Sequence, residues 1–179
     1  VFSHLNGMFA IAIWDSKRRQ LVLGRDRLGQ KPLVYSQASQ RLLFASELKA
    51  ILKIPGVSRE IDFNAVDDYL AYQYVPHPYT IFKDIKKLPP GHRAIYKSGT
   101  LTIEPYWSPR WGSERDCSYE SAKDELRRLM KSAVELRMRA DVPLGAFLSG
   151  GIDSSLVVAL MQQVADLSLI HISEPTRPC

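Results

Sequence analysis

Apolar and polar residues alternate in blocks along the first part of the chain, and these blocks predict β-structure. Residues 8–14 are an apolar run rich in strand formers, and a polar turn at 15–20 separates them from the apolar residues 21–24. This pattern predicts a β-hairpin with a long loop. Two further short strands are expected at 32–36 and 42–45.

Helical signals follow these strands. Residues 47–52 suit a short helix, and Asp62 is a candidate N-cap for a second helix that ends before Pro76. The segment 92–104, with a turn at 98–99, then predicts a second hairpin. The first hundred residues are therefore expected to form a sheet flanked by helices.

The pattern changes after residue 107. Turn formers and charges without periodicity occupy 108–116, which makes this stretch the expected linker. Ser118 can then cap a long helix whose apolar stripe is expected to face a core. The stripe consists of Ala122, Leu126, Leu129, Met130, Ala133 and Val134. A short apolar strand at 144–148, a glycine turn and an apolar helix at 156–164 predict the start of an α/β unit.

Composition places the chain among globular proteins. It has 179 residues, a formal net charge of +5, 45% hydrophobic residues and 24% charged residues. No apolar run approaches the roughly 18–20 residues of a membrane span. Cys117 and Cys179 cannot build a disulfide framework, so a reducing cytoplasm is expected. The first residue, Val1, lies inside patterned sequence, from which we expect the chain to be a fragment.

The sequence SGGIDSS at 149–155 is the feature that carries chemistry, because it lies between the expected strand and helix. Gly150 and Gly151 let the backbone turn tightly and approach an anion. The first amides of the helix, at the positive end of its dipole, form an anion site. Three hydroxyl side chains are expected around it: Ser149, Ser154 and Ser155. The pattern predicts a phosphate ligand.

Asp153 would repel a bare phosphate, so its place in this segment favours a hard cation such as Mg²⁺ that bridges phosphate oxygens. A simpler interpretation remains open from the residues alone. Asp153 or Ser154 could be an ordinary N-cap, and Gly150 and Gly151 a plain turn.

SGGIDSS resembles the pyrophosphate-binding loop of ATP pyrophosphatases, which cleave ATP between the α and β phosphates. Several upstream segments narrow the resemblance to glutamine-hydrolysing asparagine synthetases over residues 1–166. These segments are NGMFA at 6–10, GRDRLGQKPL at 24–33, FASELKAI at 44–51, LPPGH at 88–92 and DVPLGAFLSGGIDSS at 141–155.

The resemblance implies an α+β fold for the C-terminal part of an N-terminal-nucleophile glutaminase sandwich, followed by the start of an α/β adenine-nucleotide hydrolase-like domain. The implied divisions are glutaminase over 1–107, linker over 108–118 and synthetase over 119–166. The remaining residues, 167–179, contain Pro175 and Pro178 and are expected to be an unstructured tail, either an adapter-derived artefact or a genuine terminus.

For the nucleotide site, the resemblance implies that Leu148 contacts the nucleotide. It assigns the pyrophosphate of ATP to a set of loop residues: Ser149, Gly150, Gly151, Asp153, Ser154 and Ser155. Asp153 is the expected Mg²⁺ ligand. The family's N-terminal cysteine nucleophile has no counterpart, so the chain is expected to contain no catalytic residue and to lack glutaminase activity.

The parent activity implied is synthesis of asparagine from aspartate, ATP and glutamine through β-aspartyl-AMP. The expected partners are these small molecules and a second copy in a homodimer, without nucleic acid or membrane. A related amidotransferase or a β-lactam-synthetase-like amide-forming enzyme is the alternative. Truncated edges and exposed apolar faces lead us to expect poor stability.

Two other signals are weighed. The pI near 9.2 raises the alternative of a nucleic-acid-binding module, but the basic residues at 17–19, 83–87 and 127–131 come in short groups near acids, which is typical of a solvated face. The glycines at 24 and 29 do not form a phosphate-binding P-loop, because Gln30 separates Gly29 from Lys31. Arg25 and Asp26 are expected to make structural ion pairs or loop hydrogen bonds.

Overall fold

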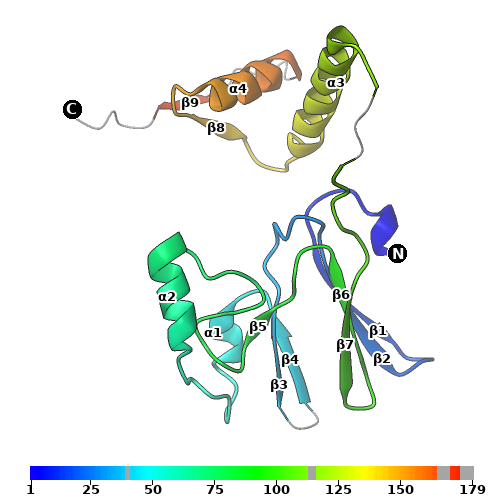
Figure 1. Cartoon of the computed structure of the whole chain (residues 1–179), viewed down its shortest axis with the longest axis vertical. Coiled ribbons are helices and arrows are strands. Elements are labelled where there is room, and N and C mark those ends of the chain that lie inside the picture. Colours follow the sequence, from blue (N-terminus) through cyan, green and yellow to red (C-terminus); the bar gives the residue numbers. More distant parts are fainter. Residues whose placement is uncertain (39–40, 113–115, 165–169, 174–179) are drawn as a thin grey trace. The chain divides into compact units, whose positions relative to one another are not determined.

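The computed structural model describes residues 1–38, 41–112, 116–164 and 170–173 (Figure 1). The chain divides into two compact units, Val1–Trp111 and Gly112–Cys179, which we call unit 1 and unit 2. The division falls inside the expected linker 108–118. Within the described residues, no helix is both long and apolar enough to cross a membrane.

A four-stranded antiparallel sheet forms one half of unit 1, and its strand order is β1-β2-β6-β7. A short 3₁₀ helix, η1 (Phe2–His4), precedes it. The strands are β1 (Ala10–Asp15), β2 (Gln20–Arg25), β6 (His92–Lys97) and β7 (Thr100–Pro105). Both expected hairpins are therefore confirmed.

A three-stranded antiparallel sheet of order β4-β3-β5 forms the other half. Its strands are β3 (Val34–Ala38), β4 (Arg41–Ala45) and β5 (Lys86–Lys87). Two helices follow β4 along the chain, α1 (Leu48–Ile51) and α2 (Phe63–Tyr72). Figure 1 shows both helices on the side of unit 1 that holds this smaller sheet.

The ends of α2 follow from local chemistry. The carboxylate of Asp62 accepts the backbone N–H of Asn64 at 3.1 Å, which confirms Asp62 as the N-cap. Gln73 ends the helix in the left-handed conformation, with φ of 63°, three residues before Pro76.

The core of unit 1 has two parts, because successive residues of a strand point to opposite faces. The first part contains Leu23 of β2 and Ala94 of β6, with Tyr35 of β3 packed against them. The second part contains Val34 of β3 and Ile51 of α1. The smaller sheet therefore contacts the larger sheet's core through one face and α1 through the other.

The described residues of unit 2 form two helices and one pair of strands. The elements are α3 (Tyr119–Arg137), β8 (Gly145–Leu148), α4 (Ile152–Val164) and β9 (Ile170–Ser173). The hydroxyl of Ser118 accepts the N–H of Ser121 at 3.2 Å, so the predicted N-cap of α3 is confirmed. β8 and β9 pair in parallel, with Gly145 opposite Ile170.

The strand β9 corrects the expectation of an unstructured tail over 167–179. Residues 170–173, in which Ile170 and Ile172 alternate with polar residues, form a strand that pairs with β8 along its whole length. Pro175 and Pro178, the basis of that expectation, lie outside the described residues.

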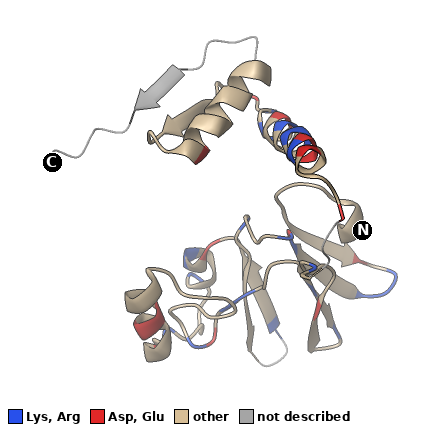
Figure 2. Cartoon of the chain, turned by 45° about the horizontal axis from the view of Figure 1, so that its top comes forward, with Lys and Arg blue, Asp and Glu red and all other residues tan. Residues whose placement is uncertain are grey.

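The apolar stripe of α3 is not buried, contrary to the expectation that it faces a core. Leu126 is 57% exposed and Leu129 is 50% exposed, and α3 has no buried residue in the described part of the chain. Unit 2 is small, and small units cover a lower fraction of their apolar surface. Met161 of α4 is its one buried hydrophobic residue among those described. Acidic and basic residues alternate along the rest of α3 (Figure 2).

Candidate functional site

The candidate site is the connection between β8 and α4. β8 ends at Leu148, Ser149 and Gly150 make the turn, and α4 begins at Ile152. Gly150 has a φ of +80°, a conformation that side chains with a Cβ rarely adopt. The predicted sequence of strand, glycine turn and helix is therefore confirmed, although the helix begins four residues before the predicted residue 156.

Because α4 begins early, Asp153, Ser154 and Ser155 lie in the first helical turn. The N–H of Ser155 donates to the carbonyl of Gly151 at 3.1 Å. The N–H groups of the residues before Ser155 have no intrahelical carbonyl acceptor, because they belong to the first turn. They therefore point outward at the positive end of the helix dipole. This arrangement suits an anion, and the 13-residue length of α4 provides the aligned dipole.

The three serine hydroxyls meet at the helix start. The Oγ atoms of Ser149 and Ser154 are 3.1 Å apart. Ser154 and Ser155 both donate to the carbonyl of Gly151, at 3.1 and 2.8 Å. A hydroxyl has one proton, so Ser149 is the donor toward Ser154 in this arrangement. The serines are brought together as expected, but two of the hydroxyl protons point to the backbone.

Gly151 has no positive φ, and a Cβ placed there would meet the Oγ of Ser149 at an ordinary 3.5 Å. The backbone conformation thus favours a glycine at 150, whereas neither conformation nor packing demands one at 151. A Cβ at 151 would stand in the hydroxyl cluster, where a phosphate would have to approach.

Asp153 is exposed in the first turn of α4. No group of three or more potential metal-ligating side chains occurs among the described residues, so the structure does not identify a Mg²⁺ site. Mg²⁺ in nucleotide sites is commonly held by one or two carboxylates together with phosphate oxygens and water. A single carboxylate beside the anion site is compatible with that mode.

The segment after β2 has a structural role, as expected for Arg25 and Asp26. The Arg25 guanidinium donates to the carbonyls of Gly29, Lys31 and Leu88. The buried Asp26 carboxylate accepts backbone N–H groups, which come from Phe9, Leu28, Gln30 and Lys31. These groups hold the segment closed on itself, and no phosphate-binding turn is present in it.

Electrostatics within this segment follow from its burial. Burial alone would raise the pKa of Asp26, but the backbone donors, from Lys31 first and then Gln30, Phe9 and Leu28, outweigh it and lower the pKa below the ordinary carboxyl value. Burial also lowers the pKa of Arg25, and the charge of Asp26 partly offsets this effect. Both groups remain charged at neutral pH.

Family comparison identifies both halves of the chain. Residues 1–107 match the glutamine amidotransferase domain family, and residues 125–175 match the asparagine synthase family. The chain therefore belongs to the glutamine amidotransferase domain family, and residues 125–175 of its second unit match the asparagine synthase family. The second match contains the whole β8–α4 connection.

Individual relatives are similar along nearly the entire chain. A Methanocaldococcus jannaschii protein provisionally named glutamine-hydrolysing asparagine synthetase 2 is 39% identical over 170 residues, which are 93% of this chain and 33% of the relative. Glutamine-hydrolysing asparagine synthetase 3 of Bacillus subtilis is 39% identical over 88% of this chain and 26% of its own length. Amidase chry2 of Gibberella zeae is 34% identical over 90% of this chain and 24% of its own length. The chain spans about one third or less of these relatives.

Proposed function

We propose that this chain is part of a glutamine-hydrolysing asparagine synthetase and that its β8–α4 connection binds the pyrophosphate portion of ATP. One observation carries the proposal. An anion-binding arrangement of strand, glycine turn and helix follows a glutamine amidotransferase domain in the same chain. The asparagine synthase match over 125–175 and the names of the relatives support it.

In this proposal unit 1 is the C-terminal part, 1–107, of a glutaminase sandwich of the N-terminal-nucleophile type, and 119–166 begins an α/β domain of the ATP-pyrophosphatase type. Two antiparallel sheets in unit 1 and a parallel strand pair in unit 2 support this assignment. Among the described residues, the exposed Cys117 has no disulfide partner, in keeping with a reducing cytoplasm. We expect a homodimer and no nucleic-acid substrate.

The proposed reaction has two steps. An oxygen of the aspartate β-carboxylate attacks the α-phosphorus of ATP, the bond to the bridging oxygen breaks, and pyrophosphate leaves. Ammonia released from glutamine then attacks the β-carbonyl carbon of β-aspartyl-AMP, and AMP leaves with the electron pair of the broken bond. Negative charge develops on the departing pyrophosphate in the first step, so donors fixed around it lower the barrier.

Each loop residue has a role in this proposal. Gly150 provides the left-handed turn, and Gly151 leaves room for the phosphates. The hydroxyls of Ser149, Ser154 and Ser155 rotate from their present partners to donate to phosphate oxygens, at little cost because a hydroxyl rotor is free to turn. Leu148, half-buried at the end of β8, contacts the nucleotide. Asp153 holds Mg²⁺, which would neutralise part of the phosphate charge.

The alternative from the sequence is a related amide-forming enzyme that acts on another acceptor. An amide-forming enzyme of the same layout would use the same nucleotide chemistry with another carboxylate. The β8–α4 connection contacts ATP and not the acceptor in either case, so it does not discriminate between the two.

The test is aspartate-dependent exchange of labelled pyrophosphate into ATP by a chain extended to the length of the relatives. We expect exchange that requires aspartate and Mg²⁺ and that is lost in Gly151→Val. Exchange that depends on another carboxylate would support the amidase-like alternative. Absence of exchange with every carboxylate, in a folded protein that still hydrolyses glutamine, would contradict the proposal.

A further inference from the structure

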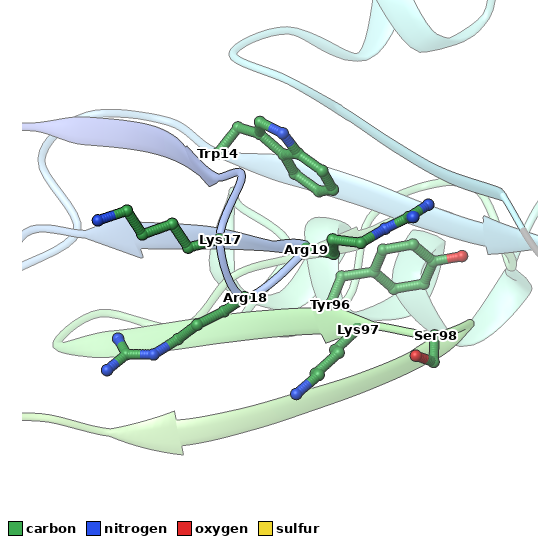
Figure 3. Close-up of a pocket in the computed structure, with 7 residues that line it drawn as sticks. All are labelled: Trp14, Lys17, Arg18, Arg19, Tyr96, Lys97 and Ser98. Carbon is green, nitrogen blue, oxygen red and sulfur yellow. The ribbon is translucent and has the colours of Figure 1, made fainter.

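Unit 1 has a basic and aromatic cavity at the turns of the β1–β2 and β6–β7 hairpins. Figure 3 shows this cavity, which has a volume of about 410 Å³. The residues that line it are Trp14, Lys17, Arg18, Arg19, Tyr96, Lys97 and Ser98. A volume of this size lies in the range of small-molecule sites, roughly 300–1,000 Å³, and far exceeds the ~30 Å³ share of one water. We call it the hairpin cavity.

Strand register brings its parts together from distant positions in the sequence. Trp14 lies opposite Leu21, and Leu21 lies opposite Tyr96, so the two aromatic residues share one row and one face of the sheet. Lys97 lies opposite Gln20 in the next row. The turns after β1 and β6 therefore close side by side at one end of the sheet.

The charges of the hairpin cavity are only partly compensated. Arg18 pairs with Asp15, at 3.6 Å between its Nη1 and the carboxylate, and its backbone N–H donates to the same side chain. Among the described residues, Lys17, Arg19 and Lys97 form no ion pair. The described residues that line the cavity include no acidic residue. An anion bound there would meet uncompensated positive charge.

The aromatic residues add a second kind of contact. Trp14 is 61% exposed, although it is the largest apolar side chain of β1. In Figure 3 the side chains of Trp14, Arg19 and Tyr96 extend toward the same side, whereas Lys17 and Arg18 extend the other way. A flat ring can stack on an exposed indole while an attached anion reaches a neighbouring guanidinium.

We propose that the hairpin cavity binds a small molecule with an aromatic ring and a phosphate, such as a nucleoside monophosphate. The ring stacks on Trp14, and the phosphate is held by Arg19. This site lies in unit 1 and is separate from the proposed ATP site of unit 2. Its ligand is not consumed, so it would act as an effector site.

The test uses the indole N–H signals of the 179-residue chain in ¹⁵N NMR, with AMP as the probe. Trp14→Phe identifies the Trp14 signal, which reports on the hairpin cavity itself. We expect this signal to shift and to saturate as AMP is added. The affinity obtained for AMP should be about tenfold higher than that for inorganic phosphate. Arg19→Gln is expected to weaken AMP binding roughly tenfold. Lys53→Gln, an exposed cation elsewhere in unit 1, serves as the matched control and should leave binding unchanged.

If Arg19→Gln does not fold, Arg19→Asn, whose side chain tolerates the positive φ of 48° at this position, replaces it with the same expected direction. Three results would overturn the proposal: no saturable shift, equal affinity for AMP and inorganic phosphate, or equal weakening in Lys53→Gln and the cavity variants. Tight, salt-sensitive binding of a single-stranded oligonucleotide without a response to AMP would also overturn it and would assign the cavity to nucleic acid.

Discussion

The guanidinium of Arg25 donates to the carbonyl oxygen of Leu88 at 2.7 Å, across 63 positions of the sequence. Leu88 in turn donates its N–H to the carbonyl of Leu33, which leads into the smaller sheet. The adjacent Asp26 does the reverse, because its carboxylate accepts the backbone N–H groups of Gln30 and Lys31. Neighbouring charges thus satisfy both donors and acceptors of the segments that join the two sheets.

Asp26→Asn is expected to destabilise unit 1 by about 2–4 kcal/mol. Both carboxylate oxygens accept backbone N–H groups, and Asp26 is 1% exposed. An amide NH₂ in place of one oxygen would face two donors, which would stay unsatisfied. Urea unfolding followed by tryptophan fluorescence measures the change. The exposed Asp67→Asn on α2 is the control, with an expected change within about 0.5 kcal/mol.

The difference in stability between the parent chain and Asp26→Asn should depend on pH. The folded-state pKa of Asp26 lies below its unfolded value, so its contribution is present above the unfolded pKa, near 4, and is lost as pH falls through the folded value. The stability difference between the parent chain and Asp26→Asn should therefore be largest above about pH 5 and shrink below about pH 4. A difference that grows toward acid pH would contradict this account.

Local sequence signals predict the hairpins but not the pairing between them. β1 and β2 are joined by one polar turn, as are β6 and β7, and alternation with turn residues is enough to identify each pair. The β2–β6 pairing, with Leu21 opposite Tyr96, joins residues far apart in the sequence. Periodicity carries no information about such contacts, and so the hairpin cavity could not be predicted.

Gly24→Ala is expected to destabilise unit 1 by roughly 1–3 kcal/mol through overpacking. A Cβ at this position would lie 2.2 Å from Cε1 of Phe2. Phe2 is buried against Phe9 and Tyr106, with ring centroids at 6.1 and 5.4 Å, so its ring has little room to move. Denaturant unfolding of Gly24→Ala, Phe2→Ala and the double variant measures the coupling. We expect Gly24→Ala to be nearly neutral once the ring is removed, and purely additive effects would disprove the contact.

Gly91→Ala differs because the obstacle is backbone. Its φ is +66°, and a Cβ would lie 2.6 Å from the carbonyl oxygen of Trp107. Its own carbonyl accepts the N–H groups of Tyr106 and Trp107 at 2.9 and 3.2 Å, so the two segments cannot separate without breaking these bonds. We expect a loss of about 2 kcal/mol or more, not relieved by Trp107→Ala. Thermal unfolding of Gly91→Ala, alone and combined with Trp107→Ala, measures the loss of stability. Recovery of stability in the combined variant would show that the Trp107 side chain, and not its backbone, is the obstacle to a Cβ at position 91.

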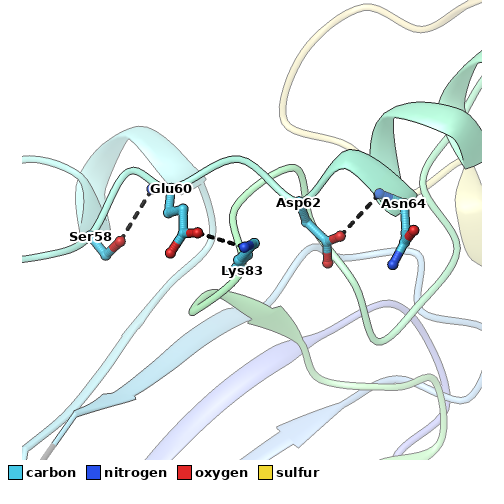
Figure 4. A network of polar contacts seen from close by, with 5 residues as sticks. All are labelled: Ser58, Glu60, Asp62, Asn64 and Lys83. Atoms are coloured by element: carbon cyan, nitrogen blue, oxygen red, sulfur yellow. Dashed lines mark hydrogen bonds and ion pairs between the residues drawn. The ribbon is translucent and has the colours of Figure 1, made fainter.

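Asp62 and Lys83 allow a helix cap and a surface ion pair to be compared in one region (Figure 4). Asp62→Ala removes the N-cap of α2 and should cost about 1 kcal/mol, whereas Asp62→Ser should keep most of the stability. The ion pair of Lys83 with Glu60, at 2.5 Å, joins two largely exposed side chains. Glu60→Gln should therefore change the urea midpoint little. A larger effect for Glu60→Gln than for Asp62→Ala would reverse this ranking.

The β8–α4 connection shows how far sequence reasoning reaches at a site. The residues and their order predict the turn and the meeting of the serines, because SGGIDSS directly precedes an apolar helix. The hydroxyl directions and the early start of α4 depend on hydrogen bonds to the carbonyl of Gly151, which composition does not specify. The burial of β8 and α3 depends on neighbouring elements, and Phe147 is 74% exposed.

Asp153→Asn tests the proposed division of labour between the two units in a chain extended to the length of the relatives. If Asp153 holds Mg²⁺ at the pyrophosphate, the variant should slow ATP-dependent amide synthesis about a hundredfold or more, because charge neutralisation at the leaving group is lost. Glutamine hydrolysis should remain nearly intact, since its chemistry belongs to the other domain. Glu135→Gln, an exposed acid on α3, is the matched control and should leave both activities unchanged. Measuring asparagine and glutamate formation together at several Mg²⁺ concentrations separates the outcomes. Normal synthesis by Asp153→Asn at limiting Mg²⁺ would remove the metal role from this residue and leave the glycine turn and the helix amides as the whole of the anion site.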